Sequence, residues 1–189
     1  LFRSVPVEAR FADGEREVVL FGASKVTIVE IASGTRREIA APDVTALEIS
    51  GPIAYWIDRK GALWKLDLAG TVPLQVPVDE PVHDLAASPD GRWIALAGAN
   101  HLLVADRTQP AQPPTPVMTG DTRALAWSAD SLDLGALVGD SLIRVRMEGE
   151  PDIVFRRDVG RRTAVAATKA GLYTAGPTGV VVRPDGPAR

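Results

Sequence analysis

The sequence has 189 residues, of which 46% are hydrophobic and 24% charged, and its formal net charge is −3. These values are typical of a globular protein with a sizeable core, and they argue against intrinsic disorder and against nucleic acid as the general partner. The absence of cysteine excludes disulfides, thiolate metal sites and a cysteine nucleophile, and no apolar stretch approaches the roughly 20 residues of a membrane-spanning helix.

The chain consists of five copies of one unit. The copies begin at Val5, Val44, Val82, Thr122 and Arg162, a spacing of roughly 40 residues. A spacing that is this regular over five units predicts a repeat architecture. We expect one domain over residues 1–189, with units at 5–43, 44–81, 82–121, 122–161 and 162–189, the last of which lacks its fourth strand.

The predicted elements follow the same order in each unit. The first unit has an Asp13-Gly14 turn after its first strand. The third unit shows the pattern in full, with an alternating strand over 82–87, a turn over 88–91, an alanine-rich strand over 93–97 and a third strand over 102–106. The Pro-Asp-Gly of this turn is a strong turn signal, because Pro presets φ, Asp bonds its own backbone and Gly supplies a positive φ. A looser fourth strand is expected after a polar loop.

The number of strands per unit indicates the fold class. Strands of this length with frequent turns favour an all-β fold, and the 15 Pro and 17 Gly leave little room for helices. Four strands in roughly 40 residues favour a β-propeller of four-stranded antiparallel blades. About four and a half to five blades are present. They either close as a five-bladed ring, with Leu1–Ser4 completing the last blade, or form part of a larger ring, whose open edge strands would pair with another chain.

The turn of the third unit carries a family resemblance. Ser88-Pro89-Asp90-Gly91-Arg92-Trp93-Ile94-Ala95 resembles the S-P-D-G-x-x-[ILV]-A turn of WD40-like and TolB-like bacterial β-propeller repeats, and Trp127-Ser128-Ala129-Asp130 resembles the same element one unit later. The resemblance implies a propeller over essentially the whole chain. The Trp-Asp and Gly-His dipeptides of WD40 proteins are missing, so their Asp–His–Ser–Trp hydrogen-bond network is not expected.

Small and aromatic side chains are expected between the blades. A single blade cannot bury both of its faces, and stacking the blades buries them. The alanines of the second strands suit this crowded packing: Ala95, Ala97, Ala136 and Ala175. The four tryptophans are expected to fill the wider outer wedges between blades: Trp56, Trp64, Trp93 and Trp127.

The sequence shows no catalytic, cofactor or metal motif, and we expect no enzyme activity. The G-x-S-x-G elbow and the P-loop are absent. His83 and His101 are predicted to be hydrogen-bonded structural residues, since no further ligands are spaced around them. The acidic residues of the fourth unit do not match an EF-hand loop and are expected at turns and strand ends: Asp130, Asp133 and Asp140.

Three functions stay open for such a scaffold. The leading expectation is a non-catalytic protein-interaction or regulatory scaffold, whose partner is another protein or the remainder of its own chain. Its candidate partner-binding rim is the basic cluster of Arg156, Arg157, Arg161 and Arg162. The alternative is the propeller sensor portion of a larger bacterial multidomain protein, a kinase, peptidase or NTPase whose active domain lies elsewhere. The third is a ligand-binding or catalytic site at the central channel.

Two further expectations concern the chain as a whole. Its first residue is not Met and its last unit lacks a strand, which indicates a processed product, an excised domain or part of something longer. No signal peptide is visible. A cytoplasmic location is expected, and a periplasmic or extracellular one stays open because the sequence does not begin with Met.

Overall fold

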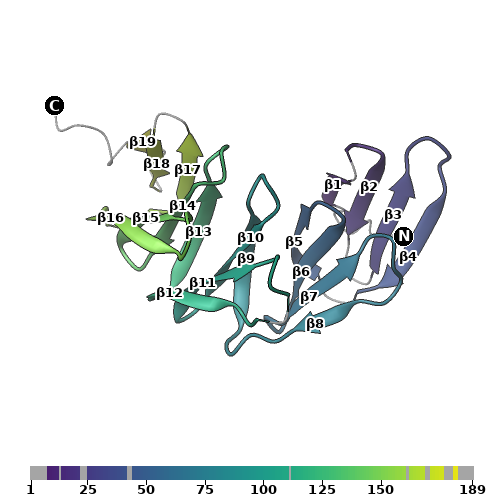
Figure 1. The fold of residues 1–189 in the computed structure, drawn as a ribbon, viewed down its shortest axis with the longest axis horizontal. Coiled ribbons are helices and arrows are strands. Elements are labelled where there is room, and N and C mark those ends of the chain that lie inside the picture. The colour runs from purple at the N-terminus through teal and green to yellow at the C-terminus, as the bar shows by residue number, and fades with distance from the viewer. Residues whose placement is uncertain are drawn as a thin grey trace, which may run out of the picture. The chain divides into compact units, whose positions relative to one another are not determined.

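The computed structural model describes residues 8–12, 14–21, 25–41, 44–110, 112–160, 162–168, 171–176 and 181–182. Within these ranges the elements of secondary structure are all β-strands. The strands form five antiparallel sheets, which we call blades 1 to 5 (Figure 1). The all-β prediction is therefore confirmed. Over the same described ranges, no helix is long and apolar enough to cross a membrane.

The chain divides into two compact units, Leu1–Pro81 and Val82–Arg189. The N-terminal unit holds two four-stranded blades. Blade 1 contains β1 (Glu8–Ala12), β2 (Glu17–Phe21), β3 (Lys25–Glu30) and β4 (Arg36–Ala40) in this spatial order. Blade 2 contains β5 (Val44–Ser50), β6 (Ile53–Asp58), β7 (Leu63–Asp67) and β8 (Leu74–Val76).

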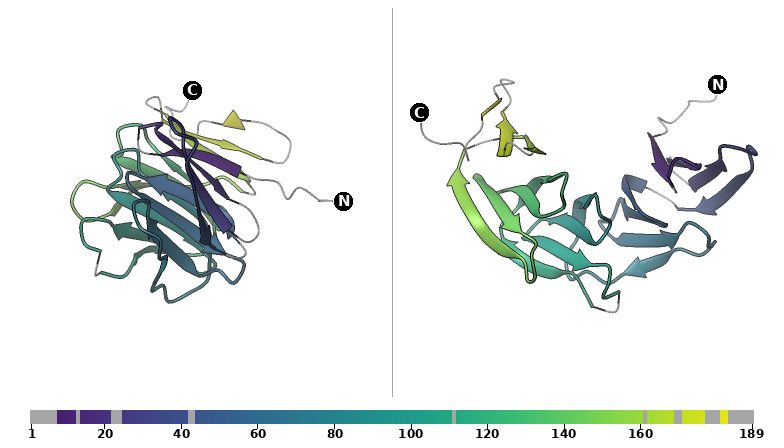
Figure 2. Two further views of the ribbon diagram at one scale, coloured as in Figure 1. Left: turned by 90° about the vertical axis from the view of Figure 1, so that its right-hand side faces the viewer. Right: turned by 45° about the horizontal axis from the view of Figure 1, so that its top comes forward.

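The C-terminal unit holds blades 3 to 5. Blade 3 contains β9 (Val82–Ala87), β10 (Trp93–Gly98), β11 (His101–Asp106) and β12 (Thr115–Thr119). Blade 4 contains β13 (Thr122–Trp127), β14 (Asp133–Val138), β15 (Ser141–Arg146) and β16 (Asp152–Asp158). Blade 5 has three strands in the described part of the chain, β17 (Ala164–Thr168), β18 (Gly171–Ala175) and β19 (Val181–Val182). Within each unit, neighbouring blades stack face to face (Figure 2).

A serine closes the first hairpin of blades 3 and 4. Ser88 Oγ donates to Asp90 Oδ1 (2.5 Å) and accepts from the backbone N–H of Trp93 (2.9 Å). In blade 4, Ser128 Oγ donates to Asp130 Oδ1 (2.6 Å) and accepts from the backbone N–H at the start of β14 (2.9 Å). One hydroxyl therefore holds both the turn and the strand that follows it.

Each hydrophobic core lies between two blades. In the N-terminal unit, apolar residues of blades 1 and 2 form one buried cluster, among them Val19, Phe21, Ile28, Leu47 and Trp56. In the C-terminal unit, blades 3 and 4 form a second cluster, among them Ala95, Leu102, Leu134, Ala136 and Ile143. The packing predicted for the alanines is confirmed for Ala95, Ala97 and Ala136, which are fully buried, whereas Ala175 is only half-buried.

The four tryptophans occupy different places between blades. Trp56 and Trp93 are buried. Trp56 and Trp64, on the adjacent strands β6 and β7, stack with ring centroids 6.4 Å apart. Trp127 ends β13, a first strand that contacts the first strands of its neighbours, β9 and β17. The outer-wedge prediction is therefore wrong for Trp127, because its ring stands at the inner end of the blade.

Candidate functional site

The predicted basic rim lies at the outer strand of blade 4. Arg156 and Arg157 are consecutive residues of β16, and both are exposed. Successive residues of a strand point to opposite faces. Arg156 is paired with Ile143, which belongs to the core with blade 3, whereas Arg157 is paired with Leu142, which packs towards blade 5. The side chains of the two arginines therefore lie on opposite faces of the blade.

The other two arginines of the rim are placed less favourably for one shared patch. Arg162 is half-buried and its Nε donates to the carbonyl oxygen of Val159 (3.1 Å). Arg161 lies outside the described residues. Arg156 Nε is 3.4 Å from Ser141 Oγ. The basic rim remains a prediction.

The histidine and aspartate predictions concern structural roles. His83 Nε2 donates to the carbonyl oxygen of Thr122 in blade 4 (2.7 Å), so the structural role predicted for His83 is confirmed. Asp130 lies in the Ser128 turn, Asp133 begins β14 and accepts from Arg146 (2.7 Å), and Asp140 lies in the next turn, as predicted. Among the described residues, no three His, Asp or Glu side chains come together as a metal site would require.

Hydrogen bonds between described residues tie blade 3 to blade 4. Besides the bond from His83, Trp127 Nε1 donates to the carbonyl oxygen of Ala86 (3.0 Å). The backbone N–H of Asp90 donates to Ser131 Oγ (2.9 Å), so the two serine turns are themselves linked. These bonds fix the relative position of the two blades. Sequence reasoning did not anticipate them, because each joins residues roughly one repeat apart.

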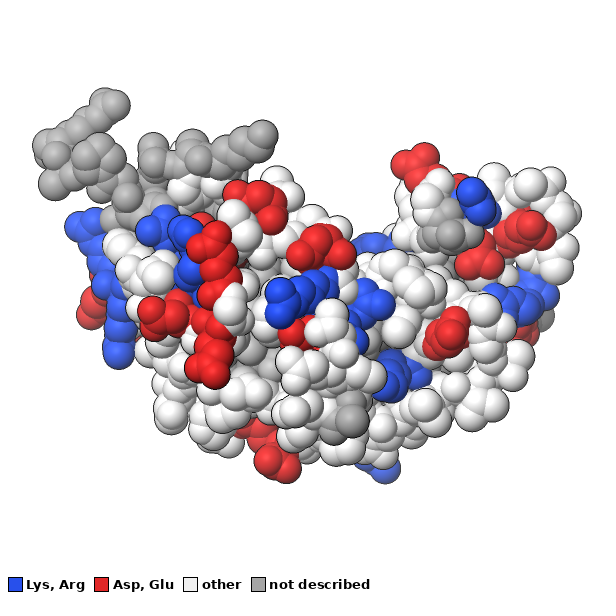
Figure 3. Space-filling view, in the orientation of Figure 1, with Lys and Arg blue, Asp and Glu red and all other residues white. Residues whose placement is uncertain are grey.

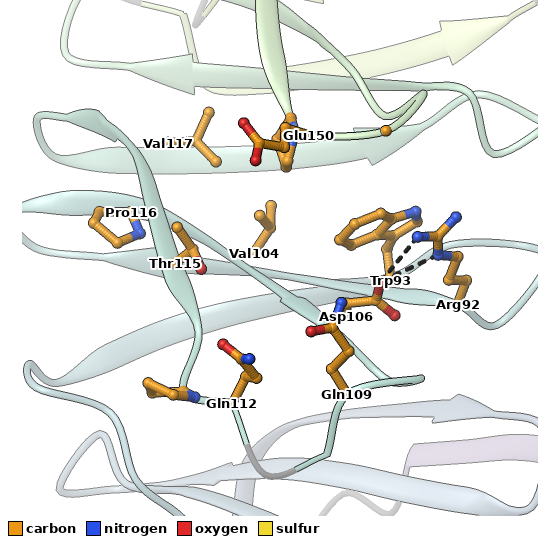
Figure 4. Close-up of a pocket in the computed structure, with 13 residues that line it drawn as sticks. Arg92, Trp93, Val104, Asp106, Gln109, Gln112, Thr115, Pro116, Val117 and Glu150 are labelled. Atoms are coloured by element: carbon orange, nitrogen blue, oxygen red, sulfur yellow. Dashed lines mark hydrogen bonds and ion pairs between the residues drawn. The ribbon is translucent and has the colours of Figure 1, made fainter.

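A cavity opens between the outer parts of blades 3 and 4 (Figure 4). Its volume is about 440 Å³. Blade 3 contributes the floor and one wall, and the loop before β16 contributes the other wall. Its lining includes Trp93, Val104, Asp106, Gln109, Val117 and Glu150. In the close-up, Glu150 lies across the cavity from Asp106 and Gln109, with Val104 and Trp93 between them.

Arg92 covers one side of this cavity. Its guanidinium lies 4.6 Å from the centroid of the Trp93 ring and donates twice to Asp106 Oδ2, from Nη2 (2.9 Å) and from Nε (3.3 Å). Thr108 donates to Asp106 Oδ1 from its backbone N–H (2.8 Å) and its hydroxyl (2.6 Å). Burial opposes ionisation of Asp106, but the hydrogen bonds from Arg92 and Thr108 outweigh it and lower its pKa.

Blade 1 exposes an apolar sheet face, which we call the open face (Phe11, Val18, Leu20 and Val29). Phe11 is paired with Val18, Val18 with Val29, and Leu20 lies on the same face two residues further along β2. Phe11 is 65% exposed, and the other three are half-buried. The opposite face, with Val19 and Phe21, is buried against blade 2. No described strand of the N-terminal unit covers the open face.

The same positions of blade 4 are packed against a neighbour. Trp127 is paired with Leu134 and Leu134 with Val145, exactly as Phe11 is paired with Val18 and Val18 with Val29 in the corresponding strands. These blade 4 residues belong to or pack against the core with blade 3, where Leu134 and Val145 are fully buried. The open face of blade 1 therefore has the composition of a covered blade face. The sequence signal for it was the run of four apolar residues at 18–21 in β2, which places apolar side chains on both faces of the blade.

Charged side chains of both signs are interspersed over the visible surface (Figure 3). Several form ion pairs within a blade, such as Arg92 with Asp106 and Arg123 with Asp140. The surface in this view is therefore a mixture of signs rather than a field of one sign.

No protein-family model and no curated protein sequence matches this chain. Solved structures match nearly all of it. The β-propeller domain of Myceliophteria thermophila Cps50 (Swd1) is 16% identical with a TM-score of 0.72, covering 93% of this chain and 63% of that one. A chain of the mitotic checkpoint complex is 19% identical with a TM-score of 0.70, covering 93% and 59%. A chain of Kuenenia stuttgartiensis hydrazine synthase is 15% identical with a TM-score of 0.68, covering 95% and 55%.

The fold is a β-propeller. The β-propeller fold that the Ser-Pro-Asp-Gly turn implied is thus present. This chain spans less than two thirds of the length of each of the three solved structures. Because identities this low show the fold alone, and the three include both a checkpoint complex and a hydrazine synthase, the fold does not distinguish a scaffold from an enzyme.

Proposed function

We propose that this chain is a non-catalytic protein-interaction module that uses its propeller as a scaffold. The observation that carries the proposal is the open face of blade 1. Phe11 is 65% exposed there, whereas the equivalent Trp127 packs against the neighbouring blade and donates a hydrogen bond to it. Contiguous apolar surface of this kind marks a protein contact more often than scattered single residues do.

The shape of the open face favours a protein over a small ligand. Its residues lie on the pleated surface of a sheet, and a sheet face is stabilised when another sheet or a helix packs on it. Fully burying a large apolar side chain contributes about 1.5–3 kcal/mol. Phe11 has most of its surface left to bury, so it is expected to dominate the binding free energy.

A matched pair of variants tests this role. Phe11→Asp places a charge on the open face, and Val72→Asp places the same charge at a residue that is 70% exposed in blade 2, away from that face. The partner is first identified by native mass spectrometry of the purified complex and then titrated, itself purified, against each variant. Phe11→Asp is expected to weaken binding by at least about tenfold, and Val72→Asp to leave it unchanged. Equal binding by the two variants would overturn the assignment of this face.

A second candidate is that the chain is the propeller portion of a larger multidomain protein. The observation that favours it is the length of the similar propellers, of which this chain spans 55% to 63%. The open face would then be covered by further blades of the same polypeptide. Hydrogen exchange on the complete gene product separates the two: slow exchange over β2 and β3 in a product of monomeric mass supports the second candidate and rejects the first.

A further inference from the structure

We infer that the cavity between blades 3 and 4 binds an Arg or Lys side chain of a partner protein, carried two residues away from an aliphatic residue in an extended segment. The inference rests on the proposed role as a protein-interaction module. It concerns a surface in the C-terminal unit, separate from the open face of blade 1. The proposals for the two surfaces can therefore be tested independently.

The cavity is preformed. Trp93 and Val104, which form its floor, are 6% and 2% exposed and belong to the core shared by blades 3 and 4. The bonds from His83, Trp127 and Asp90 hold the two blades together. Because the walls are already fixed, a ligand would lose little affinity to ordering them.

The cavity exists because nothing large fills the outer wedge at this point. The loop after Asp106 runs through several prolines, and β12 begins only at Thr115. The first side chains that β12 brings to the cavity, Thr115 and Pro116, are short and exposed. On the other wall, Gly149 and Pro151 flank Glu150. The resulting volume of about 440 Å³ lies within the range of protein ligand sites, roughly 300–1,000 Å³.

The charge of the lining favours a cation. It contains one cationic side chain, Arg92, and two carboxylates, Asp106 and Glu150. Arg92 is held by Asp106 through two hydrogen bonds. Glu150 is exposed, and it makes no hydrogen bond or ion pair with any other residue that the structure describes. The lining therefore has one carboxylate left to pair with a ligand.

The floor favours a ligand whose cation is carried on an aliphatic chain. Val104 and Val117 offer apolar surface between the two carboxylates, and Arg and Lys bury their methylenes along such surface while the charged end stays wet. Arg92 already shows this arrangement from within the protein, with its guanidinium over Trp93 and its charge on Asp106. A second cation would extend towards Glu150.

A peptide is favoured over a free amine because of the neighbouring strand. β12 is the last strand of its sheet, so one side of its backbone is not paired within blade 3. An extended segment can add to such an edge, with alternate side chains entering adjacent pockets. A basic residue would enter the cavity, and an aliphatic residue two positions away, on the same side of the extended segment, would fill the rest of its volume.

The test is a titration of the whole chain with acetyl-Arg-Ala-Val-amide, followed by the indole ¹H–¹⁵N signals of the four tryptophans. Trp93→Phe assigns the Trp93 signal, and Trp56 and Trp64 in the N-terminal unit serve as internal controls. A saturable shift of Trp93 is expected, because Trp93 is the one of the four tryptophans that lines the cavity. The same peptide with citrulline in place of Arg, which removes the charge and keeps the size, is expected to bind several-fold more weakly.

Glu150→Gln is expected to weaken the Arg peptide by up to about fivefold, the range of an exposed ion pair. Glu148→Gln is the matched control, because Glu148 lies in the same loop, faces Arg146 at 3.6 Å and is not part of the lining. Equal binding of the citrulline peptide, no effect of Glu150→Gln, or no saturable shift of Trp93 would each overturn the inference. The Phe11→Asp variant is expected to bind this peptide normally, so failure of the open-face proposal and failure of this one are separate results.

Discussion

Ser131 shows how a single side chain can hold two blades together. It takes the place that Gly91 has in blade 3 and shares its left-handed backbone, with φ of 63°. Its side chain is buried, and its Oγ accepts from the backbone N–H of Asp90 in the neighbouring blade. The left-handed region is unfavourable for a residue with a Cβ. The hydrogen bond between the blades offsets that strain.

Replacing Ser131 separates the two effects. Ser131→Ala keeps the strain and removes the acceptor of Asp90, so it is expected to lower the free energy of unfolding by about 1–2 kcal/mol. Ser131→Gly also removes the acceptor but relieves the backbone, and it is expected to be more stable than Ser131→Ala by roughly 1 kcal/mol. Urea denaturation of the three proteins measures both differences. An alanine variant as stable as the parent would show that the bond contributes nothing.

The packing of blade 3 disfavours the charged form of Asp84. It lies on β9 opposite Ala97, on the face towards blade 4, and burial raises its pKa against the opposing effects of the Leu85 N–H and His83. A raised pKa means that the folded state binds the proton more tightly than the unfolded state does. The charged carboxylate therefore destabilises the fold above its folded-state pKa, and this effect disappears below pH 3.8.

Asp84→Asn is accordingly expected to raise the urea midpoint at pH 7. The amide oxygen can still accept from the Leu85 N–H, which donates to Asp84 Oδ1 at 2.9 Å. The gain is expected to shrink as the pH falls towards 3.8, the ordinary pKa of an Asp side chain. A gain that is the same at pH 7 and at pH 4 would point to a cause other than the charge.

At the scale of the elements, hairpins are closed by single carboxylates. Asp58, at the end of β6, accepts from the backbone N–H groups of Lys60 (2.8 Å) and Ala62 (3.0 Å) and from Trp64 Nε1 (3.1 Å). Burial opposes its ionisation, but these bonds outweigh it and lower its pKa. The β6–β7 hairpin and the stacked pair of Trp56 and Trp64 therefore depend on one ionised side chain.

Asp58→Ala removes all three bonds and is expected to lower the free energy of unfolding by roughly 2–3 kcal/mol, a value typical of bonds to a charged group. Since the pKa is lowered in the folded state, the stabilisation by Asp58 is present above pH 3.8 and is lost as the pH falls through the folded value. Denaturation at pH 7 and at pH 3 measures both effects. Loss of the variant's disadvantage at low pH is expected, and a constant difference would contradict the role of the charge.

The elements themselves could be predicted from the sequence, because alternating apolar residues, Ser-x-Asp turns and glycines with positive φ are local signals. The residues that surround each element could not be predicted in this way. Both faces of blade 1 carry apolar residues, so the continuous apolar run in β2 does not tell whether Val18 or Val19 is covered. The cavity beside Trp93 depends on the side chains of two blades, which no single repeat contains. The separation of Arg156 and Arg157 onto two faces was predictable, since neighbouring strand residues always diverge.

At the scale of the whole molecule, the open face of blade 1 has a consequence for behaviour in solution. An uncovered apolar sheet face is a site of self-association. We expect the purified chain to associate increasingly with concentration, and Phe11→Ser to reduce this association. Sedimentation velocity over a range of concentrations measures it, with Val72→Ser as the control at an equally exposed apolar residue of blade 2. A larger effect of the control would contradict the assignment.

Every blade is assembled from one uninterrupted stretch of sequence, with its strands in chain order. Within a blade, each strand after the first pairs with the strand that precedes it in the chain, so most backbone pairing joins residues close in sequence, unlike the distant pairings of a β-sandwich. Folds rich in local contacts reach their native state faster. Each blade of this chain can therefore form its hairpins while the next blade is still being translated. Its apolar face is then buried once the neighbouring blade has formed and packs against it.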